Sequence, residues 1–185
     1  SWQWLRPPSP SMVRRLLNIE LAHLALLSDG LASGAPWVLI LEDDAFASDV
    51  SDLSDGIRGL MALDHDVAFV NLSESFTPAQ LGITHLLSPV TDVVWAGSIP
   101  RMVLGAAVPV TNTVCAIAYS SSFLEVLLPA MTDLPASPVV PIDWKLNQAL
   151  MSLHAEGAFA RSACWLVEPA PIRQMSMRPA EILTP

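Results

Sequence analysis

The sequence predicts an α/β fold in which helices flank a mainly parallel β-sheet. Segments with apolar residues at helical spacing alternate with short continuous apolar runs, which are typical of strands buried on both faces. The chain has 185 residues, close to the commonest size of one domain, and it contains neither an evident linker nor an internal repeat. We therefore expect residues 1–185 to form a single domain.

A long helix and a buried strand open the predicted fold. Apolar side chains recur at helical spacing from Met12 to Leu31, and Gly30 and Gly34 supply stop signals. The apolar run Trp37–Leu41 follows at once and predicts a parallel strand covered on both faces. This strand ends in three consecutive carboxylates, so it also marks the first candidate site.

The same two patterns predict the remaining elements. Prolines and glycines between Thr77 and Pro109 predict irregular chain with one or two short strands, and Pro135–Pro141 predicts a loop. Serines before the helix that starts at Ser121 are suited to cap it. The other predicted helices and strands are, in order, helix Leu53–Leu63, strand Asp66–Leu72, strand Thr113–Tyr119, helix Ser121–Met131, helix Asp143–His154 and strand Phe159–Val167.

Composition and charge exclude several classes of protein. Hydrophobic residues make up 52% of the chain and charged residues 15%, so a substantial core can form. No apolar run reaches the roughly 18 residues of a membrane-spanning helix, although peripheral contact with a membrane stays open. The formal net charge of −9 argues against binding of nucleic acid, which requires a basic surface. A phosphate-bearing small ligand would need a cation as its partner.

The cysteines and the first residues bear on the cellular compartment. Cys115 and Cys164 lie within apolar runs, where buried free thiols are the common state, and this favours the reducing cytoplasm. The chain begins at Ser1 without a methionine or a signal-peptide pattern, so we expect an excised fragment or a processed product.

The carboxylates Glu42, Asp43 and Asp44 are the most informative feature. They follow a buried strand, and in open α/β sheets ligands bind at the carboxyl ends of the strands. Adjacent carboxylates repel one another, whereas Mg²⁺ or Mn²⁺ bound to their oxygens relieves the repulsion. Residues two apart in a strand share a face, so we expect Glu42 and Asp44 to hold one ion. The alternative is that Asp43 or Asp44 caps the next helix.

An ordered set of motifs over residues 16–176 resembles glycosyltransferase family 25, which includes lipopolysaccharide and collagen sugar transferases. The family typically shows a histidine in a helix, a strand ending in Glu-Asp-Asp, a strand followed by a serine-led helix, a Pro-x-Asp, and a tail with Pro, Gln and Ser. The matching residues are Ala22-His23, Gly34–Ala45, Thr113–Ser120 before Phe123–Leu128, Pro141-Ile142-Asp143, and Pro169, Pro171, Gln174 and Ser176.

The resemblance implies a GT-A-like, Rossmann-related fold and a metal-dependent hexosyltransferase. The implied reaction moves a hexose, with inversion, from a nucleotide-diphosphate sugar such as a UDP-hexose to a hydroxyl of a glycan or glycoconjugate, as in lipopolysaccharide biosynthesis. Mn²⁺ or Mg²⁺ on Glu42 and Asp44 would stabilise the leaving diphosphate, and His23, Asp43 and Gln174 would bind substrate. The family's first strand, which carries nucleotide-binding arginines, is not matched here, so the domain is expected to be incomplete at its N-terminus.

Asp143 is the candidate general base, by its position in the family motif. A carboxylate there could accept the proton of the acceptor hydroxyl. It could equally cap the helix that begins at this point. For His23 the alternative is a hydrogen-bonded core histidine, and for Gln174 it is a side chain that satisfies loop backbone.

Two other functions stay open at this point. The family's serine before the helical histidine is Ala22 here, which is compatible with a non-catalytic relative that binds sugar nucleotides or a partner. An unrelated metal-dependent phosphate enzyme could also place acidic residues at a strand end, because this chemistry recurs on many folds.

Overall fold

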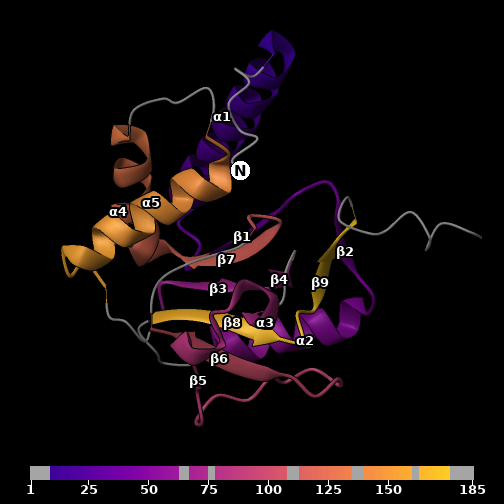
Figure 1. The fold of residues 1–185 in the computed structure, drawn as a ribbon. Helices are drawn as coiled ribbons and strands as arrows, with labels where there is room; N and C mark the ends of the chain where they lie inside the picture. Colours follow the sequence, from indigo (N-terminus) through magenta and orange to yellow (C-terminus); the bar gives the residue numbers. More distant parts are fainter. Residues whose placement is uncertain are drawn as a thin grey trace, which may run out of the picture.

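The computed structural model describes residues 9–62, 67–74, 78–107, 113–134, 140–159 and 163–175, and it has the expected α/β architecture (Figure 1). Its helices are α1 (Pro10–Ala32), α2 (Val50–Met61), α3 (Pro78–Leu81), the 3₁₀ helix η2 (Thr84–Leu86), α4 (Ser121–Asp133) and α5 (Ile142–Ala155). Its strands are β1 (Trp37–Leu41), β2 (Ala45–Ala47), β3 (Phe69–Asn71), β4 (Ser73–Glu74), β5 (Leu87–Pro89), β6 (Met102–Ala106), β7 (Ala116–Ser120), β8 (Cys164–Glu168) and β9 (Ile172–Gln174).

The main sheet has six strands in the order β1-β7-β3-β8-β6-β5, and it is mixed. Strands β3 and β8 are parallel, whereas β7 is antiparallel to both of its neighbours and β6 is antiparallel to β8 and β5. A smaller sheet, β2-β9-β4, begins just beyond the carboxyl end of β1. The prediction that β1, β3 and β7 share one sheet is confirmed, but the prediction that this sheet is mainly parallel is wrong.

The direction of β7 could not be read from its apolar run. Such a run reports that both faces of a strand are covered, and a central strand of a mixed sheet is covered on both faces just as a parallel strand is. The reversal matters for the site, because it brings the start of β7 to the edge where β1 and β3 end. The strand itself is also shorter than expected: Thr113 to Cys115 precede it, and β7 begins at Ala116.

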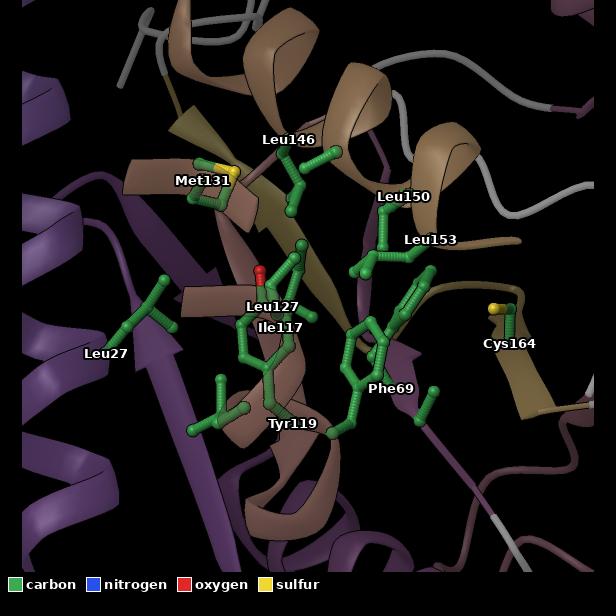
Figure 2. Packing of buried hydrophobic residues seen from close by; sticks show 14 of the residues in the cluster. Leu27, Phe69, Ile117, Tyr119, Leu127, Met131, Leu146, Leu150, Leu153 and Cys164 are labelled. Carbon is green, nitrogen blue, oxygen red and sulfur yellow. The ribbon is translucent and has the colours of Figure 1, made fainter. Parts of the chain in front are cut away.

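Helices cover both faces of the main sheet, with a separate apolar core on each face. On β3, Phe69 belongs to the core with α1, α4 and α5, and the next residue, Val70, belongs to the core with α2. Figure 2 shows the first core, with Leu27 of α1, Leu127 of α4 and Leu150 of α5 converging on the sheet. The one-residue alternation of strand side chains thus builds a three-layer structure.

Local capping residues explain where the helices start. Ser9 accepts a hydrogen bond from the amide of Met12 and precedes a proline, so α1 begins two residues earlier than predicted. Ser120 caps α4 through the amide of Phe123, which confirms the predicted serine cap. Asp49 caps α2 through the amide of Asp52.

Helices over most of the predicted segments and two short strands in the irregular middle segment are confirmed. The last strand that the sequence predicted is β8, which begins at Cys164 instead of Phe159, and residues 160–162 before it are among those that the structure leaves out. The predicted end of the second helix at Leu63, the start of the next strand at Asp66, Ser176, and residues 135–139 of the proline-rich loop also lie outside the described residues.

Two buried ion pairs connect distant parts of the fold. Lys145 of α5 pairs with Glu20 of α1. In the other pair, Asp52 of α2 accepts hydrogen bonds from the Arg101 guanidinium at 3.1 and 3.2 Å, the Ile99 amide at 2.7 Å and the Trp95 indole at 3.3 Å. Burial alone would raise the pKa of Asp52, but these hydrogen bonds outweigh it and hold the pKa below its usual value.

Candidate metal and phosphate site

The backbone after β1 holds the acidic cluster, Glu42, Asp43 and Asp44, at the edge of the main sheet. The Glu42 amide donates to the Cys115 carbonyl at 2.9 Å, and the Ala45 amide donates to the Glu42 carbonyl at 3.1 Å, which closes a turn. The Met175 amide, just after β9, donates to the Asp44 carbonyl at 2.9 Å. The cluster is therefore fixed by both the main sheet and the small sheet.

The turn divides the three carboxylates as the sequence predicted, although for a different reason. Glu42 and Asp44 are half-buried and Asp43 is exposed. The strand stops at Leu41, so the division comes from the turn and not from strand alternation. Ligand atoms of Glu42, Asp44 and Cys115 all lie within 4.8 Å of one another, close enough to contact one ion.

The capping alternative for the acidic cluster is wrong. The N-cap of the next helix, α2, is Asp49, whose side chain accepts from the amide of Asp52 at 2.9 Å. Strand β2 lies between the acidic cluster and that helix. Asp43 and Asp44 are thus available for a role other than helix capping.

The electrostatics of Glu42 are those of a site that a cation would stabilise. Burial raises the pKa of Glu42, and the negative charges of Asp44, Asp43 and Asp143 raise it further. A divalent cation bound to Glu42 and Asp44 would reverse these repulsions, since its charge favours the ionised carboxylates. The donor set fits a hard ion such as Mn²⁺ or Mg²⁺, which prefers carboxylate oxygens.

Cys115 lies beside the acidic cluster as a buried thiol. Burial and the neighbouring charges of Asp44 and Glu42 raise its thiol pKa to about 12, so the thiol stays protonated at neutral pH. Its Sγ lies 3.9 Å from Oδ1 of Asp44, to which the thiol can donate. The prediction that Cys115 and Cys164 are buried free thiols is confirmed. Sequence reasoning did not place Cys115 beside the acidic cluster, because that position depends on the reversed direction of β7.

Gln174 lies at the acidic cluster although 132 positions separate it from Glu42. Strand β9 pairs with β2 so that Gln174 lies opposite Ala45, the residue after the acidic cluster. Its Nε2 donates to Oε2 of Glu42 at 3.2 Å. The structure thus brings together Gln174 and Glu42, and binding of substrate by Gln174 and Asp43 stays a prediction.

Helix α5 begins at Ile142, one residue earlier than predicted. The N-cap is Pro141, which has no capping side chain, and Asp143 is the second residue of the helix. Burial raises the pKa of Asp143, and the amides of Trp144 and Asp143 itself partly oppose this rise. Because its charge also raises the pKa of Glu42, Asp143 lies within electrostatic reach of the acidic cluster. Asp143 therefore stays a candidate general base.

His23 is a buried residue of α1. Its Nδ1 lies 3.3 Å from the Ile19 carbonyl oxygen, and a carbonyl only accepts, so this nitrogen carries the proton. Burial lowers the pKa of His23, and the hydrogen bond to the Ile19 carbonyl partly opposes this effect. Its Nε2 has no hydrogen-bond partner among the residues that the structure describes. These contacts suit the core alternative, and binding of substrate by His23 stays a prediction.

Comparison with protein-family models gave no match, and comparison with curated proteins gave none either. Within the described part of the chain, none of the helices combines the length and apolar character needed to cross a bilayer.

Proposed function

We propose that this chain is the catalytic domain of a metal-dependent glycosyltransferase that uses a nucleotide-diphosphate sugar. The observation that carries the proposal is the placement of Glu42 and Asp44, with ligand atoms within 4.8 Å of each other just past the carboxyl end of β1, an outer strand of the main sheet. In α/β sheets this edge is where phosphate-bearing ligands bind. Two carboxylates leave most of an octahedral shell open, so phosphate oxygens of a donor can complete it.

The residues of the acidic cluster and Gln174 divide three roles between them in the proposed reaction. Glu42 and Asp44 bind Mn²⁺ or Mg²⁺, and Gln174 orients Glu42 by donating to its Oε2. Bound there, the ion supplies Lewis-acid stabilisation of the charge that develops on the leaving diphosphate. Asp43 is exposed beside the ion site, where it can contact donor hydroxyls.

Asp143 is the proposed general base, which accepts the proton from an acceptor hydroxyl. Burial raises its pKa toward the working pH, which improves a carboxylate as a base. Trp144, the next residue of α5, is 60% exposed and offers a flat apolar surface for a sugar ring of the acceptor. A glycan or glycoconjugate hydroxyl is the proposed acceptor, and the free thiols Cys115 and Cys164 favour a reaction in the cytoplasm.

A donor-hydrolysis screen tests this proposal. The full-length protein is incubated with Mn²⁺ and a panel of nucleotide sugars, including UDP-hexoses, and release of nucleoside diphosphate is measured with and without excess chelator. We expect chelator-sensitive release from at least one donor, and loss of that release in Asp44→Asn. Binding of a donor without release would indicate a non-catalytic relative, and hydrolysis of phosphate esters without donor hydrolysis would indicate a different phosphate enzyme.

A further inference from the structure

A chain of hydrogen bonds leads from the start of β7 to the acidic cluster. The amide of Cys115 donates to Oγ1 of Thr113 at 3.1 Å, and the Thr113 hydroxyl donates to Oε1 of Gln174 at 3.3 Å. Nε2 of Gln174 then donates to Oε2 of Glu42 at 3.2 Å. Thr113 is 5% exposed, so its hydroxyl is removed from bulk water.

One orientation of the Gln174 amide suits both of its partners in this chain. The Thr113 oxygen accepts from the Cys115 amide, and the Thr113 hydroxyl donates to the Gln174 carbonyl oxygen. This fixes the orientation of the Gln174 amide, whose NH₂ group must then face Glu42. The opposite orientation would direct the Gln174 oxygen at a carboxylate, where two acceptors repel each other.

We propose that Thr113 is a positioning residue that acts through Gln174 to orient Glu42 for the cation. This inference rests on the proposed metal site. Gln174 donates to Oε2 of Glu42, so Oε1 of Glu42 would remain for an ion bound at this site. The neighbouring Met175 amide holds the Asp44 carbonyl, so the end of β9 aligns both carboxylate-bearing residues. Groups that hold a metal-binding carboxylate from behind typically change metal affinity by about 10- to 100-fold when they are removed.

Two substitutions at Thr113 separate the hydroxyl from the shape of the side chain. Thr113→Val keeps the shape and removes the hydroxyl, whereas Thr113→Ser keeps the hydroxyl. In the full-length protein, we expect Thr113→Val to weaken Mn²⁺ binding by about tenfold or more, in line with other residues behind metal ligands, and Thr113→Ser to change it little. In a Gln174→Leu background, Thr113→Val should have no further effect, because both act on Glu42 through one path. Equal Mn²⁺ affinity in wild type and Thr113→Val, or additive losses in the double variant, would overturn the inference.

Exchange of the Gln174 side-chain amide protons gives a readout that needs no metal. By NMR, these protons should exchange slowly in the wild type and in Thr113→Ser, compared with those of the exposed Gln148, and quickly in Thr113→Val. Fast exchange in the wild type would overturn the inference even if Thr113→Val fails to fold. If the wild type binds no Mn²⁺ but the exchange pattern holds, the proposed metal site fails while the positioning of Gln174 by Thr113 stands.

Discussion

One substitution at Asp143 distinguishes a general base from a carboxylate that only stabilises the start of α5. As the general base, Asp143→Asn should lower turnover by about 10²- to 10⁴-fold and leave donor affinity nearly unchanged, because an amide cannot accept the proton. If the carboxylate only accepts from the amides at the start of α5, asparagine replaces it well and turnover stays near normal. Turnover and donor affinity are measured on the full-length protein, with the exposed Asp133→Asn as control. Near-normal turnover in Asp143→Asn would reject the base assignment.

Glu42 should weaken the fold of the metal-free protein at neutral pH. Its pKa is raised in the folded state, so the folded protein holds this proton more tightly than the unfolded chain does. The ionised carboxylate therefore opposes folding as pH rises above the ordinary value of 4.5. We expect Glu42→Gln to raise the free energy of unfolding at pH 7 in the presence of a chelator, and this gain to disappear below about pH 4. Urea unfolding of the wild type and of Glu42→Gln at both pH values measures this gain. A lower free energy of unfolding for Glu42→Gln at pH 7 would contradict the expected repulsion.

The sequence indicated some residues of the candidate site and not others, for a physical reason. Glu42 and Asp44 could be found because a strand end and three carboxylates are adjacent in the chain. Gln174 and Asp143 came from the family resemblance. Thr113 could not be found, because its importance depends on a hydrogen bond to a residue 61 positions away, and a buried threonine gives no local signal.

At the scale of elements, the buried pair of Asp52 and Arg101 links α2 to the segment before β6. Both side chains are at most 6% exposed, so Asp52→Asn leaves the Arg101 charge buried without its partner. We expect this change to lower the free energy of unfolding by about 3–5 kcal/mol. Asp55→Asn on the same helix is the matched control, because the Asp55–Arg58 pair is exposed and should cost at most about 1 kcal/mol.

The Asp52–Arg101 pair should also make the free energy of unfolding depend on pH. The pKa of Asp52 is lowered in the folded protein, so its stabilising effect is present above the ordinary Asp value of 3.8 and is lost as pH falls through the lowered value. Wild type and Asp52→Asn should thus differ less in unfolding free energy at low pH than at pH 7. A difference that does not change with pH would contradict the charged pairing.

Strand pairing shows most clearly what the sequence can and cannot specify. Apolar runs located β1, β3 and β7 and placed them in one sheet, and burial on both faces holds for β3 and β7. The prediction that β1 is buried on both faces is wrong in part, because only Val38 and Ile40 are buried and Leu41 is exposed at this outer strand. The direction of each strand depends on its pairing partners, and β7 runs antiparallel to both β1 and β3. The short strands β2, β4 and β9 had no clear pattern, since strands of two or three residues are too short to show alternation.

At the scale of the whole molecule, the mixed sheet gathers the candidate site from distant segments. The end of β1, the residues before β7, the end of β9 and the start of α5 contribute Glu42, Thr113, Gln174 and Asp143. A sheet with β7 parallel to β1 would place Thr113 and Cys115 at the opposite edge. The antiparallel pairing is therefore what allows one edge to hold the carboxylates and the groups that orient them.

The coupling between metal and nucleotide tests the central claim most directly. Calorimetry measures Mn²⁺ binding to the full-length protein with and without UDP, and to the Asp44→Asn and Asp43→Asn variants. We expect UDP to tighten Mn²⁺ binding by about 5- to 150-fold in the wild type, because phosphate oxygens complete the shell that Glu42 and Asp44 leave open. Asp44→Asn should lose this coupling, and the exposed Asp43→Asn should retain most of it. Equal Mn²⁺ affinity with and without UDP, in the wild type and in Asp44→Asn alike, would contradict a metal and diphosphate site at this edge of the sheet.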